Sequence, residues 1–148
     1  MKTLFLLLTL SSSFLFAQTI DYNLKNGFIA HGYDVVAYFN NTAVKGENQF
    51  QTTYDGVKYK FSSEKHLNIF KQNPKKYVPQ YGGYCAYAVA VKSDKVAINP
   101  KTFTITDGKL YLFYDAWGTN TLNLWDEENP TKLQSKADKN WDIIKLKK

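Results

Sequence analysis

Two pairs of segments dominate the pattern of hydrophobic and polar positions. In residues 49–54 and 57–61, apolar or aromatic side chains alternate with polar ones on either side of Asp55-Gly56. Residues 102–106 and 109–114 flank Asp107-Gly108 in a similar way. Alternation is typical of strands with one buried face, and Asp-Gly between such strands is a strong hairpin signal. The pattern therefore predicts two β-hairpins.

A helix is predicted directly after the first hairpin. Ser62 or Ser63 can cap its first turn, and Leu67 and Phe70 lie three residues apart, as on one helical face. Asn73-Pro74 then ends the helix, because proline cannot continue it.

The other segments are assigned from their composition. Residues 34–39 are rich in β-branched and aromatic side chains, which predicts a short buried strand, and residues 84–91 can form a helix. Residues 119–145 have apolar spacings that suit two short helices broken near Pro130. With no internal repeat and no linker evident, we expect one α+β domain over residues 18–148. It would contain a small antiparallel sheet built from hairpins, helices packed on the sheet and a C-terminal helical segment.

The first residues have the features of a signal peptide. Lys2 gives a positive start, residues 4–10 are apolar, and Ala17 is a small residue suited to cleavage before Gln18. The apolar stretch is shorter than the roughly 20 residues that a membrane-spanning helix needs. We therefore expect residues 1–17 to be removed and the protein to be periplasmic or secreted, with no stable membrane insertion after cleavage.

Composition argues against two classes of function. The net charge is +6, but every basic residue is Lys, and the Lys residues are scattered. Because Arg is the residue that forms paired bonds to phosphate and guanine, its absence argues against a nucleic-acid partner. No paired carboxylates, Ser-His-Asp set or His-Glu-x-x-His motif is present, so the sequence favours a protein that is not an enzyme.

The single cysteine, Cys85, lies in a segment rich in Tyr and Gly. In an exported protein, one cysteine cannot form an internal disulfide. It can be a buried apolar residue, a metal ligand or a reactive thiol. The last requires a lowered pKa, which a position in the first turn of the helix over residues 84–91 would favour. These alternatives stay open at this stage.

Several blocks in one order carry a family resemblance. Residues 32–39, 55–63, 74–77 and 81–86 together resemble the YHS domain family, and more closely its exported single-domain branch. The resemblance extends from about residue 30 to residue 141. It implies a small α+β domain of a family discussed as metal-binding, although the exported branch has no settled activity.

The resemblance also implies candidate metal ligands. The cysteines of the metal-binding members fall on His31, Ser62 and His66 of this chain, and the two histidines are the only ones present. Together with Cys85, they form a candidate site for Cu or Zn, which prefer imidazole and thiolate ligands. The departure at Ser62 weakens the inherited ligand set, because a hydroxyl is a poor ligand. Residues expected to support the site or line a pocket are Tyr33, Asp34, Tyr59, Ser62, Tyr81 and Tyr84.

Asp34 has two possible roles in this site. It can accept a hydrogen bond from His31 and fix the imidazole, or cap the turn that enters the strand expected over residues 34–39. We therefore expect a binding module for a metal ion or small molecule. The alternatives are a thiol-redox protein acting through Cys85 and a structural or interaction domain without chemistry.

Overall fold

The computed structural model describes residues 18–147, and the expected signal peptide lies outside them. The order of elements begins with two 3-10 helices, η1 (Ile29–Gly32) and η2 (Ala37–Asn40). The hairpin of β1 (Glu47–Tyr54) and β2 (Val57–Phe61) follows, and then the helices α1 (Glu64–Gln72) and α2 (Pro74–Tyr77). Among the described residues, no helix is both long enough and apolar enough to cross a membrane.

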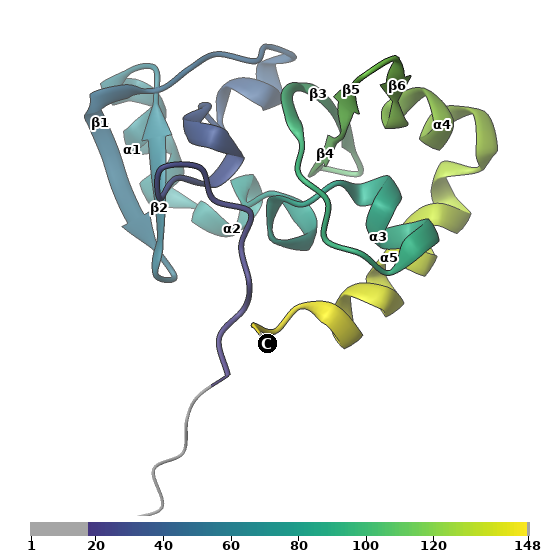
Figure 1. Cartoon of the computed structure of the whole chain (residues 1–148). Coiled ribbons are helices and arrows are strands. Elements are labelled where there is room, and N and C mark those ends of the chain that lie inside the picture. The colour runs from purple at the N-terminus through teal and green to yellow at the C-terminus, as the bar shows by residue number, and fades with distance from the viewer. Residues whose placement is uncertain (1–17, 148) are drawn as a thin grey trace, which may run out of the picture.

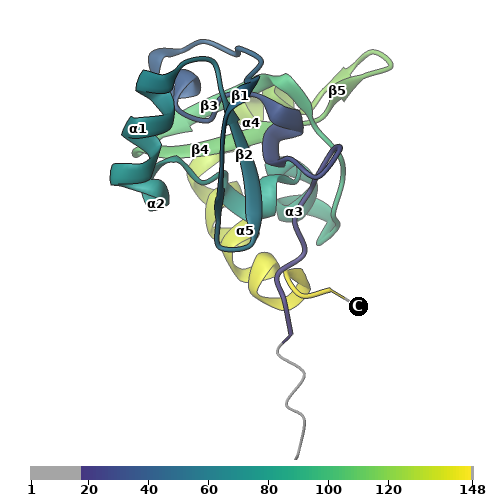
Figure 2. The same cartoon turned by 90° about the vertical axis from the view of Figure 1, so that its left-hand side faces the viewer.

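The second part of the chain repeats this order (Figure 1). The 3-10 helix η3 (Gln80–Gly83) and the helix α3 (Ala86–Lys92) precede the hairpin of β3 (Asn99–Thr106) and β4 (Lys109–Phe113). A short hairpin of β5 (Asp115–Ala116) and β6 (Thr119–Asn120) comes next and projects from the body of the molecule (Figure 2). The helices α4 (Thr121–Glu128) and α5 (Pro130–Ile144) complete the fold. The α+β class is thus confirmed.

The two parts agree in local detail as well as in order. Three consecutive residues with positive φ, residues 30–32 in one part and 81–83 in the other, precede Tyr33 and Tyr84. Asp34 N then donates to Val44 O at 2.8 Å, and Cys85 N donates to Val96 O at 2.9 Å. In each part the long strand of the hairpin has an irregular register near its start, and in each an Asn-Pro pair begins the last helix. The two parts of the structure are therefore arranged alike, although the sequence shows no internal repeat.

Both predicted main hairpins and the proline-broken helices form where the sequence placed them. The predicted single small sheet does not form, because the three hairpins are separate two-stranded sheets. Phe28 pairs with Lys58 in an isolated bridge, which occupies part of the edge of β2 that faces away from β1. The strand expected over residues 34–39 is also wrong. This segment forms a turn and then η2, because the side chain of Asp34 accepts a hydrogen bond from the backbone of the same segment.

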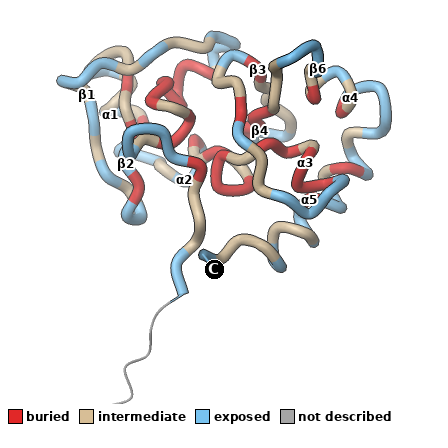
Figure 3. Tube along the Cα trace, in the orientation of Figure 1, coloured by how far each residue is buried: buried red, intermediate tan, exposed pale blue. Residues whose placement is uncertain are grey.

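Two hydrophobic clusters form the core, and an aromatic side chain from a helix packs on a hairpin in each. Figure 3 shows buried positions, in red, along β4 and α3 in the interior of the molecule. In the first, Phe70 of α1 lies 4.6 Å from Tyr59 and 5.0 Å from Phe61, between ring centroids. In the second, Trp125 of α4 lies 5.9 Å from Tyr111 and 5.5 Å from Phe113. Because β4 contributes Leu110 and Leu112 to the first cluster and Tyr111 and Phe113 to the second, it joins the two halves of the core.

Candidate functional site

Asp34 is a fully buried carboxylate at the centre of the first part of the chain. Its Oδ1 accepts hydrogen bonds from Val36 N at 2.9 Å and Ala37 N at 3.1 Å. An aspartate that bonds to backbone N–H groups two and three residues ahead stabilises a turn at the expense of a strand. This local bond explains why residues 34–39 form a turn and η2, although their composition favours a strand.

The second oxygen of Asp34 connects this turn to α1. Its Oδ2 accepts from Ser62 N at 2.8 Å, from Ser62 Oγ at 2.6 Å and from His66 Nδ1 at 2.7 Å. Five donors therefore point at one carboxyl group, which is the pattern of an ionised carboxylate that only accepts. Asp34 joins two elements that are about 30 residues apart in the chain.

The start of α1 fixes the position of His66. Ser63 is the N-cap of this helix, and its Oγ accepts from His66 N at 3.2 Å. Because the carboxylate of Asp34 only accepts, Nδ1 of His66 must carry the proton that it shares with Asp34. When the imidazole is neutral, Nε2 is then the atom with a free lone pair. The side chain of His66 is 20% exposed, so the ring is held in place by its hydrogen bond and still contacts solvent.

His31 lies in a different environment. It occupies the left-handed stretch of η1 with φ of 55° and is half-buried. Burial, and secondarily the charge of Lys25, lower the pKa of His31, so the folded protein favours its neutral form. The expected hydrogen bond between Asp34 and His31 is wrong, because the bonds of Asp34 go to its own turn, to Ser62 and to His66. Asp34 does cap a turn, but that turn leads into η2 and not into the expected strand.

Cys85 is fully buried and is the N-cap residue of α3, so it precedes the first turn instead of lying within it. Its Sγ lies 3.3 Å from Thr121 Oγ1. Thr121 Oγ1 in turn donates to Tyr114 O at 2.8 Å. Since that bond uses the only hydroxyl proton of Thr121, the thiol of Cys85 is the donor to Thr121. This arrangement suits a protonated, packed thiol better than a reactive thiolate.

His31, His66 and Cys85 do not assemble into one site. Within residues 18–147, no group of three or more His, Cys, Asp or Glu side chains is placed to hold a metal ion. The expected convergence is therefore not found. What the fold brings together instead is His66 with two other residues of the expected set, Asp34 and Ser62.

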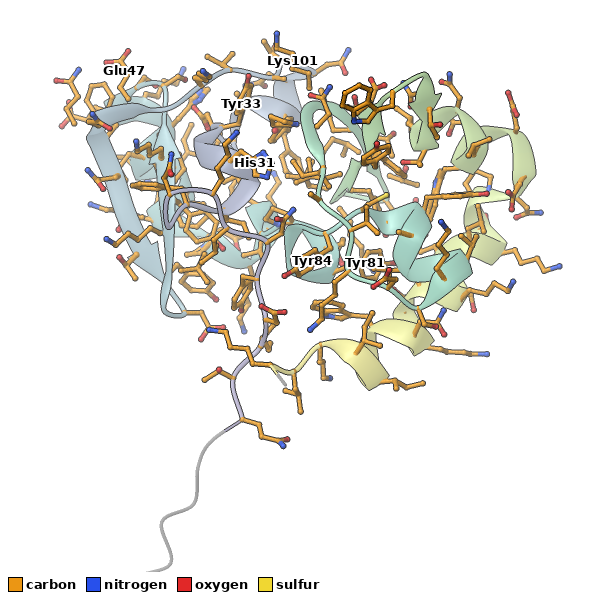
Figure 4. The ribbon with its side chains drawn as sticks, in the orientation of Figure 1. His31, Tyr33, Glu47, Tyr81, Tyr84 and Lys101 are labelled. Carbon is orange, nitrogen blue, oxygen red and sulfur yellow. The ribbon has the colours of Figure 1, made fainter. Side chains whose placement is uncertain are left out.

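The four tyrosines expected around the site have structural contacts. Tyr59 is buried against Phe70. Tyr81 donates to Asp138 Oδ1 at 2.9 Å, and burial, with that bond, raises the pKa of its hydroxyl. The pKa of Tyr84 is raised to about 12, by burial and then by Asp21. Figure 4 shows Tyr81 and Tyr84 apart from His31 and Tyr33, so these side chains do not line one common pocket.

Sequence reasoning missed Thr121 as the partner of Cys85 and His66 as the partner of Asp34. The first pair is 36 residues apart and the second 32, and neither spacing is a local motif. Ser62 and His66 are close in the sequence, but Ser62 precedes the N-cap Ser63 and only His66 lies within α1, so their spacing did not indicate Asp34 as the common partner.

Comparison with known proteins gives one match. No curated protein and no solved structure matches the chain significantly. A family model matches from the residue after Asp34 to Tyr81, so it covers the first hairpin, α1, α2 and His66, and leaves out His31 and Cys85. By this match, residues 35–81 of the chain are similar to the YHS domain.

Proposed function

We propose that this protein is an exported YHS-domain protein that binds a transition-metal ion, Cu or Zn, or a small ligand through Nε2 of His66. The observation that supports the proposal is the 2.7 Å contact between His66 Nδ1 and the buried carboxylate of Asp34. Histidines that bind metals commonly donate their other ring N–H to a carboxylate, which fixes the tautomer and the direction of the free nitrogen. His66 has this arrangement.

The supporting contacts also indicate what kind of binding to expect. The residues present fit a single imidazole ligand with an oriented ring, and Ser62 and the N-cap of α1 keep its carboxylate partner in place. A closed zinc site uses four protein ligands and a catalytic site usually three. A metal held at His66 would therefore take its other ligands from solvent or from a small molecule. Such a site binds and exchanges its cargo, which is the function of a binding module and not of an enzyme.

Export belongs to the same proposal. Residues 1–17 would be removed as a signal peptide, so the binding site would work in the periplasm or outside the cell. Mass spectrometry of the protein recovered from a secreting host tests this point. A chain that begins at Gln18 is expected, and an intact Met1 in the exported fraction would contradict it.

The two histidines provide a matched pair of variants for the binding test. Untagged protein over residues 18–148 is titrated with Zn²⁺ and Cu²⁺, and the ring signals of both histidines are followed by NMR. We expect saturable changes at His66, with affinity reduced at least about tenfold in His66→Gln, because loss of a ligand's hydrogen-bond partner alone typically costs about tenfold or more. His31→Gln is the control and should bind as the unchanged protein does. Equal binding by both variants would reject His66 as the ligand.

A further inference from the structure

The second part of the chain contains a cavity of about 580 Å³ above Cys85. This volume lies within the usual range of small-molecule sites, about 300–1,000 Å³. Most of its lining residues are apolar or aromatic, and the lining also includes four hydroxyl groups, two of them on tyrosines, the thiol and one cationic side chain. The lining residues are Cys85, Tyr87, Ala88, Lys92, Val96, Tyr114, Thr119, Thr121 and Leu124.

At the floor of this cavity, the polar groups of Cys85 and Thr121 already have hydrogen-bond partners. The thiol of Cys85 is directed to Thr121 Oγ1, and the hydroxyl of Thr121 is directed to Tyr114 O. Ala88 beside them is buried and presents a methyl group. A ligand that reaches the floor therefore gains by burying apolar surface and has no polar partner there to satisfy.

The rim carries the only charge that lines the cavity. Lys92 lies in the last turn of α3 and is exposed. Glu128 is nearby in the structure, but it is bonded to the hydroxyl of Tyr87 and is not among the lining residues. An apolar interior with a cation at its opening favours a ligand with an apolar body and an anionic end.

The repeated architecture supports the choice of this place. Cys85 follows the left-handed turn of the second part as Asp34 follows that of the first. Leu124 is the fourth residue after the N-cap of α4, as Leu67 is the fourth after the N-cap of α1. In the first part the helix covers Asp34 with His66. In the second part Thr121 covers the thiol, and an apolar cavity remains.

We propose that the cavity above Cys85 is a second ligand site, at the position that corresponds to the Asp34–His66 site, and that it binds a small apolar carboxylate. It does not depend on His66 or on any metal. The two corresponding places thus differ in chemistry: one is a polar site with a histidine, and the other is an apolar site with a lysine at its rim.

Octanoate is a suitable probe, with octylammonium as the same chain of opposite charge. Both are titrated into protein over residues 18–148, and backbone amide signals are followed by NMR. We expect saturable shifts with octanoate at Ala88, Val96 and Leu124, with a dissociation constant of about 1 mM or lower. Octylammonium should bind at least about tenfold more weakly, because it meets Lys92.

Lys92→Gln tests the charge at the rim, and Lys71→Gln is its matched control. Both lysines are exposed residues in the last turn of a helix, Lys92 in α3 and Lys71 in α1. Octanoate affinity should fall several-fold in Lys92→Gln and stay unchanged in Lys71→Gln. The proposal is overturned if octanoate gives no saturable shifts at the cavity residues. It is also overturned if octanoate and octylammonium bind equally, or if Lys92→Gln has no effect.

Discussion

Replacing Asp34 by Asn changes one carboxylate oxygen into an amide group that donates instead of accepting. The side chain keeps its size, so the substitution isolates the hydrogen bonds. Oδ1 of Asp34 accepts from two backbone donors, Val36 N and Ala37 N, and Oδ2 accepts from three donors on Ser62 and His66. Whichever way the new amide is turned, its NH₂ group faces donors that it cannot satisfy.

The less costly orientation directs the NH₂ group toward Val36 and Ala37. Val36 N then has no acceptor, whereas Ala37 N keeps its bond to the backbone oxygen of Asp34 at 3.1 Å. A buried donor that loses its partner costs about 1–3 kcal/mol, so Asp34→Asn should lower the free energy of unfolding by about 1–3 kcal/mol. This loss is a substantial part of the stability of a small domain, about 5–15 kcal/mol. Ser62→Ala removes one hydroxyl bond and should cost about 1.5–3 kcal/mol, because the bond is to a charged group.

Urea unfolding of residues 18–148, followed by tryptophan fluorescence, measures these differences. Asp55→Asn is the matched control, because Asp55 is an exposed residue of the first hairpin turn. Asparagine tolerates the positive φ of that turn, so the control should stay within about 0.5 kcal/mol of the unchanged protein. If Asp34→Asn is as stable as Asp55→Asn, the interpretation of Asp34 as the connection between the turn and α1 is refuted.

Four further substitutions test other parts of the fold. The lowered pKa of His31 means that the unfolded chain binds its proton more readily, so stability should fall as pH drops below about 6.5. Urea midpoints measured against pH should show a smaller fall in His31→Asn, and parallel curves would contradict this reasoning. An added Cβ at Gly82 would lie 2.7 Å from a backbone oxygen and 2.9 Å from the ring of Trp141, whereas at Gly118 it would meet nothing within 4 Å. Both glycines have positive φ, so Gly118→Ala should cost about 1 kcal/mol and Gly82→Ala about 3 kcal/mol or more; equal thermal midpoints would show that the contact relaxes freely. Among the side chains that the structure describes, the buried hydroxyl of Tyr111 has no hydrogen-bond partner, so calorimetry of Tyr111→Phe should show unchanged or higher stability, by up to about 1 kcal/mol. A clear loss of stability would point to a partner, such as a bound water, for that hydroxyl.

The hairpins were predictable because their signals are local. Asp55-Gly56 and Asp107-Gly108 take the positive φ values that connect two strands tightly, and no distant residue is needed for that choice. The helix after the first hairpin was predictable for the same reason, since Ser63 and Pro74 mark its start and its end within the sequence. The composition of residues 34–39 gave the wrong element, because β-propensity there competes with a side-chain bond from Asp34.

The repeat escaped sequence reasoning for a different reason. The matched positions keep few identical residues, and the β5–β6 hairpin interrupts the second part between β4 and α4. Backbone conformation preserves the correspondence better than side-chain identity does: residues 30–32 and residues 81–83 share positive φ although only one position is glycine in both. An alanine or a tyrosine in such a conformation gives no signal of it in the sequence.

The sequence by itself determined the turns, the caps and the alternation of the strands, because these depend on residues within a few positions of one another. It also named Asp34, Ser62 and His66 as members of a site. Only the tertiary structure decided which of them meet, since the contacts of Asp34 with Ser62 and His66 span 28 and 32 residues. Likewise, it separated Cys85 from the histidines and gave it Thr121 and an apolar cavity, because the packing of α4 on the second hairpin sets what faces the thiol.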